Sequence, residues 1–348
     1  MRIAVLAPVW FPVPPTGYGG IEWVVWLLAE GLVDAGHDVT LFAAGQSRTK
    51  ARLDYVFEEP PSDDIGRTAP ELKHALHCYA RQDEFDLIND HTGLLGAAVG
   101  GALRTPLAHT VHGPLDGAPG ALYEQLSAVA PGVGLISISM NQRRPKPDLN
   151  WIANCPNAID FELYPFAPYQ GDYLFFLGRM SPDKGAHRAV LTAIETGLPL
   201  KLAGKMREPL EKQYFDAYVR PHLNSRIEYV GEVSHGEKVE LLQHARATLF
   251  PIEWEEPFGL VLIESMACGT PVIATRCGAV PEVIEHGHSG VIVDDWARAG
   301  AALAEADAIS PESCRAYAEQ WFAPARMVRD YLTAYEAMLV REVSSAAQ

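Results

Sequence analysis

Short apolar runs, many of them rich in β-branched residues, alternate with amphipathic segments from one end of the chain to the other. The runs that predict strands are Arg2–Ala7, Asp38–Ala43, Phe85–Asn89, Leu107–Val111, Leu135–Ser139, Tyr173–Leu177, Leu200–Ala203, Ile227–Val230, Thr248–Pro251, Val272–Ala274 and Val291–Val293. The segments with helical spacing are Gly20–Ala35, Leu122–Ala130, Ala186–Thr196, Lys238–Ala245 and Phe258–Ala267. Buried strands that alternate with helices form parallel sheets covered on both faces, and right-handed crossovers wind them doubly. The sequence therefore predicts an α/β protein with Rossmann-like sheets.

The length of 348 residues is sufficient for two such domains. Prolines interrupt the pattern over residues 156–170, and a new strand is predicted at Tyr173. We expect one domain over residues 1–160, a second over 161–324, and a last segment, 325–348, that is helical from Ala325 to Val340. Two doubly wound sheets would leave a cleft between the carboxyl ends of their strands, where such folds bind ligands.

The composition excludes several classes of partner. The formal net charge is −16, so the surface as a whole repels nucleic acid and anionic lipid. One basic cluster, Arg143–Lys146, is either a solvated loop or a phosphate or lipid contact. No run of about 18 apolar residues is present, which predicts no membrane span. The five cysteines are odd in number and form no Cys-x-x-Cys pair, a pattern that favours reduced thiols and a cytoplasmic protein.

The segment GRMSPDKG, residues 178–185, directly follows the predicted strand YLFFL. Ser181, followed by proline and aspartate, is typical of a helix start with a capping hydroxyl. Lys184 is unusual there, because a cation in the first turn of a helix opposes the helix dipole. Either Lys184 is a surface lysine beside a turn, or Lys184 and Arg179 converge with the helix N-terminus on a phosphate.

The segment EPFGLVLIE, residues 256–264, predicts a second helix start, at Pro257, with free backbone amides at Phe258, Gly259 and Leu260. Glu256 and Glu264 would then lie about 12 Å apart along the helix axis, comparable with the reach from the sugar to the ribose of a nucleotide sugar. An ionised Glu264 in an almost wholly apolar helix is costly without partners. It either binds vicinal hydroxyls or lies on an exposed stripe of the helix.

Two features of the N-terminal half face the same predicted cleft. The loop PVWFPVPPTGYGGIEW follows the first strand and leads into a helix at Gly20, where backbone amides can touch a phosphate or a sugar. His109 and His112, in HTVHG, lie at the end of a predicted strand, where loops carry function. Each histidine is either structural or part of a site.

Five segments together resemble the retaining glycosyltransferases of family 4. They are GGIE at 19–22, HTVHG at 109–113, PNAID at 156–160, FLGRMSPDKG at 176–185 and EPFGLVLIESMACGTPVIA at 256–274. The resemblance covers nearly the whole chain. It is clearest to short bacterial members similar to tetrahydrobiopterin glucosyltransferases and antibiotic-pathway glycosyltransferases. It implies the GT-B fold, with an acceptor-side N-terminal domain, a nucleotide-sugar-binding C-terminal domain and a last helix that crosses back to the N-terminal domain.

The resemblance also implies roles for single residues. Arg179 and Lys184 would bind the donor diphosphate, and Gly20 would approach the donor phosphate or sugar. Glu256 would contact the transferred sugar and Glu264 the ribose.

The remaining implied positions belong to both domains. The amides of Phe258, Gly259 and Leu260 would lie between the two glutamates. His112 would lie near the reacting centre, and Val233 and Lys238 near the base.

These roles predict a hexosyltransferase that uses a nucleotide sugar, with UDP-glucose as the first choice, and a small or soluble hydroxyl acceptor. No cofactor or metal is expected, because Arg179 and Lys184 would neutralise the leaving diphosphate. The oligomeric state is left open. The alternatives are a nucleotide-sugar-hydrolysing epimerase on the same fold and a non-catalytic sugar-nucleotide-binding relative. A dinucleotide-dependent dehydrogenase is disfavoured, because the glycines near Gly17 lack the third glycine of its fingerprint in register.

Overall fold

The computed structural model describes residues 1–17, 19–168 and 171–346, and for 341–346 the backbone alone. Tyr18 of the first loop, the end of the proline-rich segment and the last two residues of the chain lie outside the described residues. The chain forms two compact units. Unit 1 comprises Met1–Ile159 and Pro324–Gln348, and unit 2 comprises Asp160–Ala323.

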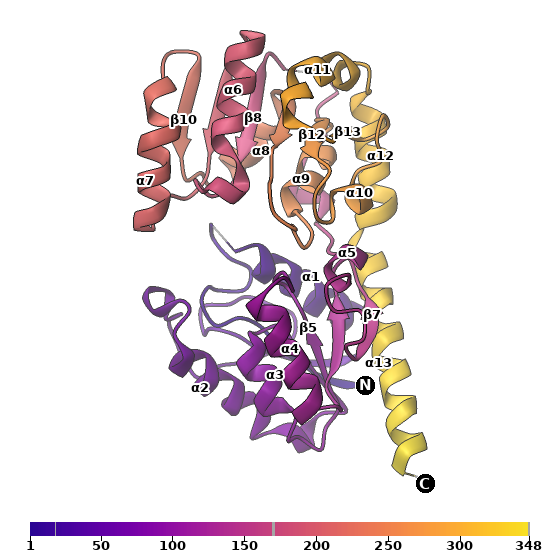
Figure 1. Cartoon of the computed structure of the whole chain (residues 1–348). Helices are drawn as coiled ribbons and strands as arrows, with labels where there is room; N and C mark the ends of the chain where they lie inside the picture. The colour runs from indigo at the N-terminus through magenta and orange to yellow at the C-terminus, as the bar shows by residue number, and fades with distance from the viewer. Residues whose placement is uncertain (18, 169–170, 347–348) are drawn as a thin grey trace. The chain divides into compact units, whose positions relative to one another are not determined.

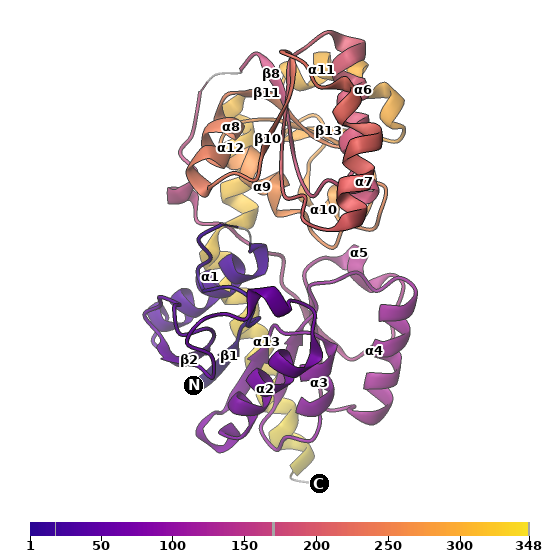
Figure 2. The ribbon, with the colours of Figure 1, turned by 90° about the vertical axis from the view of Figure 1, so that its left-hand side faces the viewer.

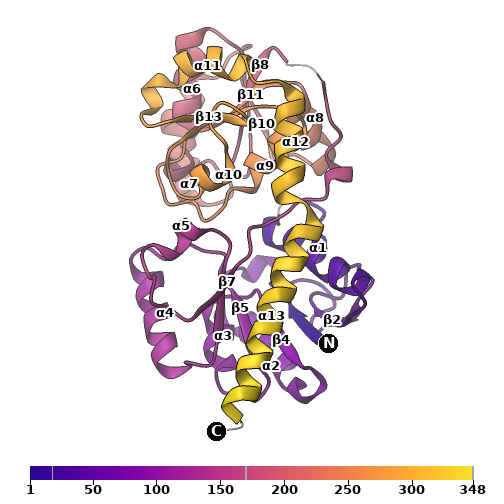
Figure 3. The same ribbon diagram turned by 90° about the vertical axis from the view of Figure 1, so that its right-hand side faces the viewer.

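Unit 1, drawn from indigo to magenta in Figure 1 with α13 in yellow, is built on a seven-stranded parallel sheet. The strand order is β3-β2-β1-β4-β5-β6-β7. Its strands are β1 Arg2–Leu6, β2 Asp38–Phe42, β3 Arg52–Asp54, β4 Leu87–Asp90, β5 Leu107–Thr110, β6 Gly134–Ser137 and β7 Trp151–Asn154. Its helices are α1 Gly20–Asp34, α2 Thr68–Tyr79, α3 Leu94–Gly100, α4 Ala118–Val129, α5 Met140–Arg143 and α13 Pro324–Ala346. Helix α13 packs against α1 and β7, as Figure 3 shows, so a segment from the end of the chain completes the core of unit 1.

Unit 2 is built on a six-stranded parallel sheet with the strand order β10-β9-β8-β11-β12-β13. Its strands are β8 Tyr173–Leu177, β9 Leu200–Ala203, β10 Ile227–Gly231, β11 Ala245–Phe250, β12 Val272–Thr275 and β13 Gly290–Val293. Its helices are α6 Ala186–Thr196, α7 Pro209–Tyr218, α8 His235–Gln243, α9 Leu260–Ala267, α10 Val280–Val283, α11 Ala299–Asp307 and α12 Pro311–Phe322. Helices α8, α9 and α12 cover one face of the sheet, and α6 and α11 cover the other (Figure 2).

Both sheets confirm the predicted α/β class with doubly wound parallel strands. The central strands are almost fully buried, since β1, β4 and β5 consist largely of side chains with no exposed surface. Two strands of unit 1, β3 and β7, are absent from the sequence prediction. Both lie at the edges of the sheet and are only partly buried, so neither has the continuous apolar run that marks a central strand.

None of the described helices combines the length and the hydrophobicity that a membrane crossing requires. All five cysteines are free thiols, and four of them are buried.

Candidate functional site

In unit 2, the site residues predicted from the sequence gather where the strand order reverses. Strand β8 is followed by β9 on one side, while β11 lies on the other side of β8. Loops at such a reversal open at the carboxyl ends of the strands and bind ligands in doubly wound folds. The loop after β8 carries Arg179 and Lys184, and the loop after β11 carries Glu256.

The two loops pack tightly against each other at Gly185. This glycine has φ +74°, and a Cβ there would overlap the backbone carbonyl of Pro251. Only glycine combines this left-handed conformation with so close an approach. The backbone amide of Glu253 also donates to the carbonyl of Asp183, at 3.0 Å, which ties the loops together a second time. The position of Lys184 relative to Glu256 is therefore set by backbone contacts.

Lys184 and Glu256 form an ion pair between these loops. Their side chains are only 16% and 13% exposed, so water screens the pair weakly. Trp254 completes the group, because its indole Nε1 donates to Glu256 Oε2 at 3.1 Å and its ring lies 4.5 Å from Lys184 Nζ. The cation and the carboxylate assigned to the diphosphate and to the sugar are thus neighbours that neutralise each other.

Arg179 is held by two further carboxylates. Its guanidinium lies 3.2 Å from Asp183 Oδ2 and 3.8 Å from Glu211 Oε1. Glu211 is buried, and its other oxygen accepts from the backbone amides of Arg207 and Glu208 at the start of α7. One third of the Arg179 side chain remains exposed. Arg179 can therefore exchange a carboxylate for an incoming anion without leaving its place.

Glu264 lies on α9 and is buried, which excludes the alternative of an exposed helix stripe. Its Oε1 accepts from Lys238 Nζ at 2.6 Å and from the Tyr164 hydroxyl at 2.7 Å. Lys238 also donates to the Tyr164 hydroxyl at 3.0 Å. Burial, and then the charge of Glu264, raise the pKa of Tyr164 far above its ordinary value. The second carboxylate of the motif therefore also has a cationic partner, and within the described residues no hydrogen bond engages its other oxygen.

Two local predictions are wrong. Helix α9 begins at Leu260. The residue before it, Gly259, has φ +85° and, as a glycine, has no side chain that could cap the helix. Because residues 256–259 are not helical, the separation of about 12 Å between the glutamates does not apply, and Phe258 contributes no helix-terminal amide. The left-handed glycine breaks the helical path that the apolar pattern suggested.

The second wrong prediction concerns Ser181. A short 3₁₀ turn, Pro182–Lys184, follows it, and α6 begins only at Ala186, after Gly185. The Ser181 hydroxyl makes no capping hydrogen bond and has no partner among the described residues. Lys184 therefore ends a 3₁₀ turn and does not lie in the first turn of the α-helix.

Val233 and Lys238 flank the start of α8. Ser234 caps this helix reciprocally with Glu237, which fixes the turn that carries them. Lys238 lies one turn into α8, in contact with Glu264, while Val233 lies half-buried in the segment before the helix.

In unit 1, Gly20 is the first residue of α1, and Gly19 before it has φ +151°. Glu22 lies in the first turn of this helix and is buried, and burial raises the pKa of its carboxyl to about 7. Glu22 belongs to the GGIE segment, but the sequence pattern alone indicates no role for it. The N-terminus of α1 therefore carries a buried carboxyl as well as free backbone amides.

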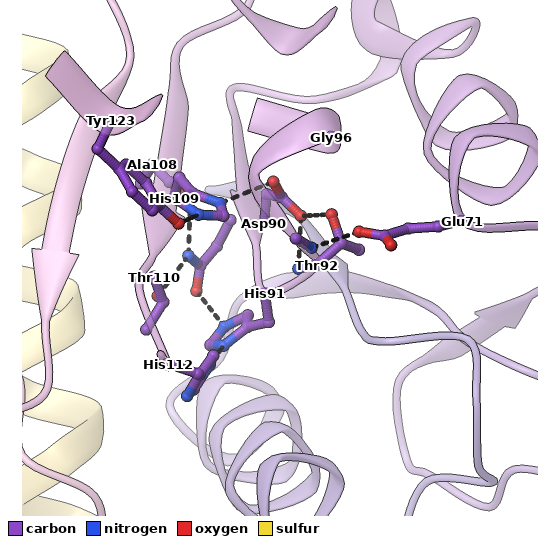
Figure 4. A network of polar contacts seen from close by, with 12 residues as sticks. Glu71, Asp90, His91, Thr92, Gly96, Ala108, His109, Thr110, His112 and Tyr123 are labelled. Atoms are coloured by element: carbon purple, nitrogen blue, oxygen red, sulfur yellow. Dashed lines mark hydrogen bonds and ion pairs between the residues drawn. The ribbon is translucent and has the colours of Figure 1, made fainter. Parts of the chain in front are cut away.

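His112 lies beyond the end of β5, in a network of polar side chains (Figure 4). Its Nε2 lies 2.9 Å from Nδ1 of His91, and the two rings are stacked. His91 in turn contacts Asn89 Oδ1 through its Nε2, at 2.7 Å. Burial lowers the pKa of His112 to about 3, and burial also holds the pKa of His91 well below its ordinary value. Both imidazoles are therefore neutral at physiological pH.

His109 belongs to a separate group in Figure 4. Its Nδ1 lies 2.8 Å from Asp90 Oδ2 and its Nε2 2.8 Å from the Tyr123 hydroxyl. All of its ring nitrogens have protein partners, and the side chain has no exposed surface. His109 therefore has a structural role. His112 differs in being only half-buried, so part of this residue remains exposed.

Two residues of the basic cluster Arg143–Lys146 are engaged within the protein, while Arg144 is exposed. Arg143 donates to Ser137 and stacks over Trp151, and Lys146 pairs with Glu124 at 2.6 Å. The described residues contain no group of three or more His, Cys, Asp and Glu side chains arranged to hold a metal ion.

Family comparisons agree with this architecture. The family described as Glycosyltransferase Family 4 matches residues 18–153, and the family described as Glycosyl transferases group 1 matches residues 166–321. The chain is therefore a glycosyltransferase, and its two parallel sheets with flanking helices form the GT-B fold. Among glycosyltransferases, it is similar to family 4.

Individual relatives extend over most of the chain. Glycogen synthase of Mycobacterium tuberculosis is 27% identical and covers 80% of this chain and 79% of its own. Phosphatidyl-myo-inositol mannosyltransferase of Mycolicibacterium smegmatis is 26% identical and covers 100% of this chain and 97% of its own. A solved glycosyltransferase involved in avilamycin A biosynthesis is 26% identical, covers 98% of both chains and has a TM-score of 0.71. A sucrose-phosphate synthase from Thermosynechococcus elongatus, 19% identical, shares the fold with a TM-score of 0.77 over 98% of this chain and all of its own.

Proposed function

We propose that this glycosyltransferase transfers a hexose, with retention, from UDP-glucose to the hydroxyl of a small or soluble acceptor in the cytoplasm. The observation that supports a diphosphate-containing donor is the set of cation–carboxylate pairs at the carboxyl edge of the unit 2 sheet. Lys184 pairs with Glu256, and Arg179 pairs with Asp183 and Glu211. A diphosphate, with its negative charges, is a ligand for which these cations would exchange partners.

In this proposal each exchange has a purpose. When Lys184 and Arg179 bind the diphosphate, Glu256 is released to accept hydrogen bonds from hydroxyls of the transferred sugar. Glu264 keeps its contact with Lys238 and accepts from the ribose hydroxyls through its remaining oxygen. Gly20 approaches the phosphate or sugar from the N-terminus of α1, and Gly259 and Leu260 approach it from the N-terminus of α9. Val233 and Lys238 lie near the base.

The proposed chemistry follows from these roles. The diphosphate leaves as Arg179 and Lys184 stabilise the charge that develops on it, which is the part a metal ion plays at other diphosphate sites. The acceptor hydroxyl attacks from the face of the leaving group, and the diphosphate takes its proton. His112 lies near the reacting centre, where its ring can form a hydrogen bond with a sugar hydroxyl. No cofactor takes part.

The relatives named above act on different substrates, as their names state, so they fix neither the donor nor the acceptor of this chain. The epimerase and the non-catalytic relative remain weaker alternatives, because the relatives found are glycosyltransferases.

A thermal-shift screen with UDP-glucose, GDP-mannose and UDP-N-acetylglucosamine tests the donor. A ligand at about 100 times its Kd stabilises the folded state by about 2.7 kcal/mol, which is easily resolved. The best donor is then incubated with candidate acceptors, and glycosylated product and free UDP are quantified. If no nucleotide sugar shifts the unfolding transition, the proposed function is wrong.

A further inference from the structure

A chain of hydrogen bonds in unit 1 runs from a backbone carbonyl to His112 (Figure 4). The Asn89 amide Nδ2 lies 3.0 Å from the carbonyl oxygen of Ala108. A carbonyl oxygen can only accept, so the amide nitrogen must face it and Asn89 Oδ1 must face the other way. On that side Oδ1 accepts from the Tyr335 hydroxyl of α13 at 2.7 Å. The Ala108 carbonyl therefore fixes the amide orientation of Asn89, and the Tyr335 hydroxyl donates to the oxygen so placed.

The protonation of His91 is fixed in the same way. Its Nε2 lies 2.7 Å from Asn89 Oδ1, which can only accept, so Nε2 carries the proton. Because burial keeps His91 neutral, its Nδ1 is left with a lone pair. That lone pair faces His112 Nε2 at 2.9 Å, so His112 must donate.

We propose that Asn89, His91 and Tyr335 are positioning residues that hold His112 with its proton on Nε2, so that Nδ1 accepts a hydrogen bond from a hydroxyl of the transferred sugar. His112 Nδ1 has no partner in the part of the chain that the structure describes. The stacked His91 ring, with centroids 5.2 Å apart and planes 29° apart, fixes the plane of His112 as well as its tautomer.

The inference rests on the proposed function for the contact with the sugar, but the tautomer belongs to the protein without a ligand. It assigns the direction of the contact, since His112 accepts and the sugar hydroxyl donates. It also explains why polar groups lie at the core of unit 1. Asn89, His91 and Tyr335 are buried, and each is satisfied by a member of the chain of hydrogen bonds.

The tautomer is measured by ¹⁵N NMR of histidine-labelled protein at pH 7, since protonated and unprotonated ring nitrogens have distinct chemical shifts. His112→Gln identifies the His112 signals. We expect Nε2 to be protonated and Nδ1 unprotonated in both His91 and His112. A proton on His112 Nδ1 in the wild-type protein would overturn the proposal, whatever the activity of any variant.

Two substitutions test the direction of the hydrogen bonds along the chain from Asn89 through His91 to His112. His91→Phe keeps a stacked ring but removes the acceptor for His112 Nε2. It should give a mixture of His112 tautomers and lower kcat about tenfold, with the donor KM within about threefold. Asn89→Asp places a carboxylate beside His91 and favours its protonated form. His91 Nδ1 should then donate, and His112 should carry its proton on Nδ1.

His74→Phe is the matched control. His74 is equally buried in unit 1, but it contacts the carbonyl of Ala7 at 3.1 Å and takes no part in the chain of hydrogen bonds to His112. It should change neither the His112 spectrum nor kcat. If His91→Phe behaves like this control while folded, the proposal fails.

Addition of UDP-glucose, but not of UDP, should shift His112 Nδ1. An unchanged signal with bound UDP-glucose would overturn the contact with the sugar. Absence of turnover with every nucleotide sugar would instead contradict the proposed function and leave the ligand-free tautomer as measured.

Discussion

Replacing Glu256 by Gln should tighten the binding of UDP while lowering the rate of transfer. In the free protein Lys184 is engaged by Glu256, within a group that is largely shielded from water. UDP has a diphosphate but no transferred sugar, so it competes with Glu256 for Lys184 and gains nothing from the carboxylate. The glutamine keeps the shape and one acceptor oxygen but removes the charge that holds the lysine.

The magnitude follows from the kind of contact. A charge-assisted hydrogen bond contributes about 1.5–3 kcal/mol, and the amide that replaces the carboxylate retains part of it. A net gain of about 1–2 kcal/mol for UDP corresponds to a five- to thirtyfold lower Kd. Transfer needs Glu256 at the sugar, where positive charge develops, so kcat should fall by at least about tenfold.

Isothermal titration calorimetry with UDP measures the Kd, and a coupled assay measures kcat. Glu255→Gln is the matched control. It removes the same charge from the neighbouring residue, whose side chain is exposed. Its UDP affinity should change less than about twofold. A Glu256→Gln protein that is folded but binds UDP as the wild-type protein does, or more weakly, would refute the exchange of partners at Lys184.

Four further outcomes are expected. Glu264→Gln should weaken UDP binding by about 1–3 kcal/mol in calorimetry, mostly through the ribose, and should raise the donor KM more than it lowers kcat. Activity should survive excess EDTA within a factor of about two; a loss that Mg²⁺ or Mn²⁺ restores would contradict the role given to Arg179 and Lys184. Co-sedimentation with anionic liposomes at physiological salt should be negligible, because Arg143 and Lys146 are engaged internally; strong binding would indicate a lipid-linked acceptor. The raised pKa of Glu22, about 7, makes the folded state bind more protons than the unfolded state above pH 4.5, so stability should fall as pH rises through 7. In urea unfolding, the free energy of unfolding of Glu22→Gln minus that of the wild type should rise by about 3 kcal/mol from pH 4 to pH 8. An equal difference at both pH values would show that Glu22 is not buried as a neutral acid.

The elements that could be predicted from the sequence are those buried on both faces. The sequence predicts Tyr173–Leu177 and Leu200–Ala203 at their observed bounds, because a central parallel strand is a continuous apolar run between polar turns. The edge strands β3 and β7 lack such a run, since one side of each meets solvent. Propensity at the ends of segments was misleading where a left-handed glycine intervenes, as Gly185 and Gly259 do.

The candidate site was predictable only in part, and for a similar reason. Arg179, Lys184, Glu256 and Glu264 lie in two short motifs that local chemistry makes conspicuous. Several residues that contact them lie outside these motifs. Tyr164 meets Glu264 across 100 residues, and Tyr335 meets Asn89 across 246. No local pattern connects residues so far apart, because only the tertiary fold brings them together.

The discontinuity of unit 1 has a consequence for synthesis on the ribosome. Unit 2, Asp160–Ala323, is complete in the nascent chain before any residue of α13 has been made. Domains generally fold as units while the chain emerges. The N-terminal 159 residues must instead wait for α13, which supplies the buried Tyr331 and Tyr335. Until then the parts of α1 and β7 that α13 contacts are uncovered. Residues 1–159 thus precede unit 2 in the chain but complete their fold only after it has been made.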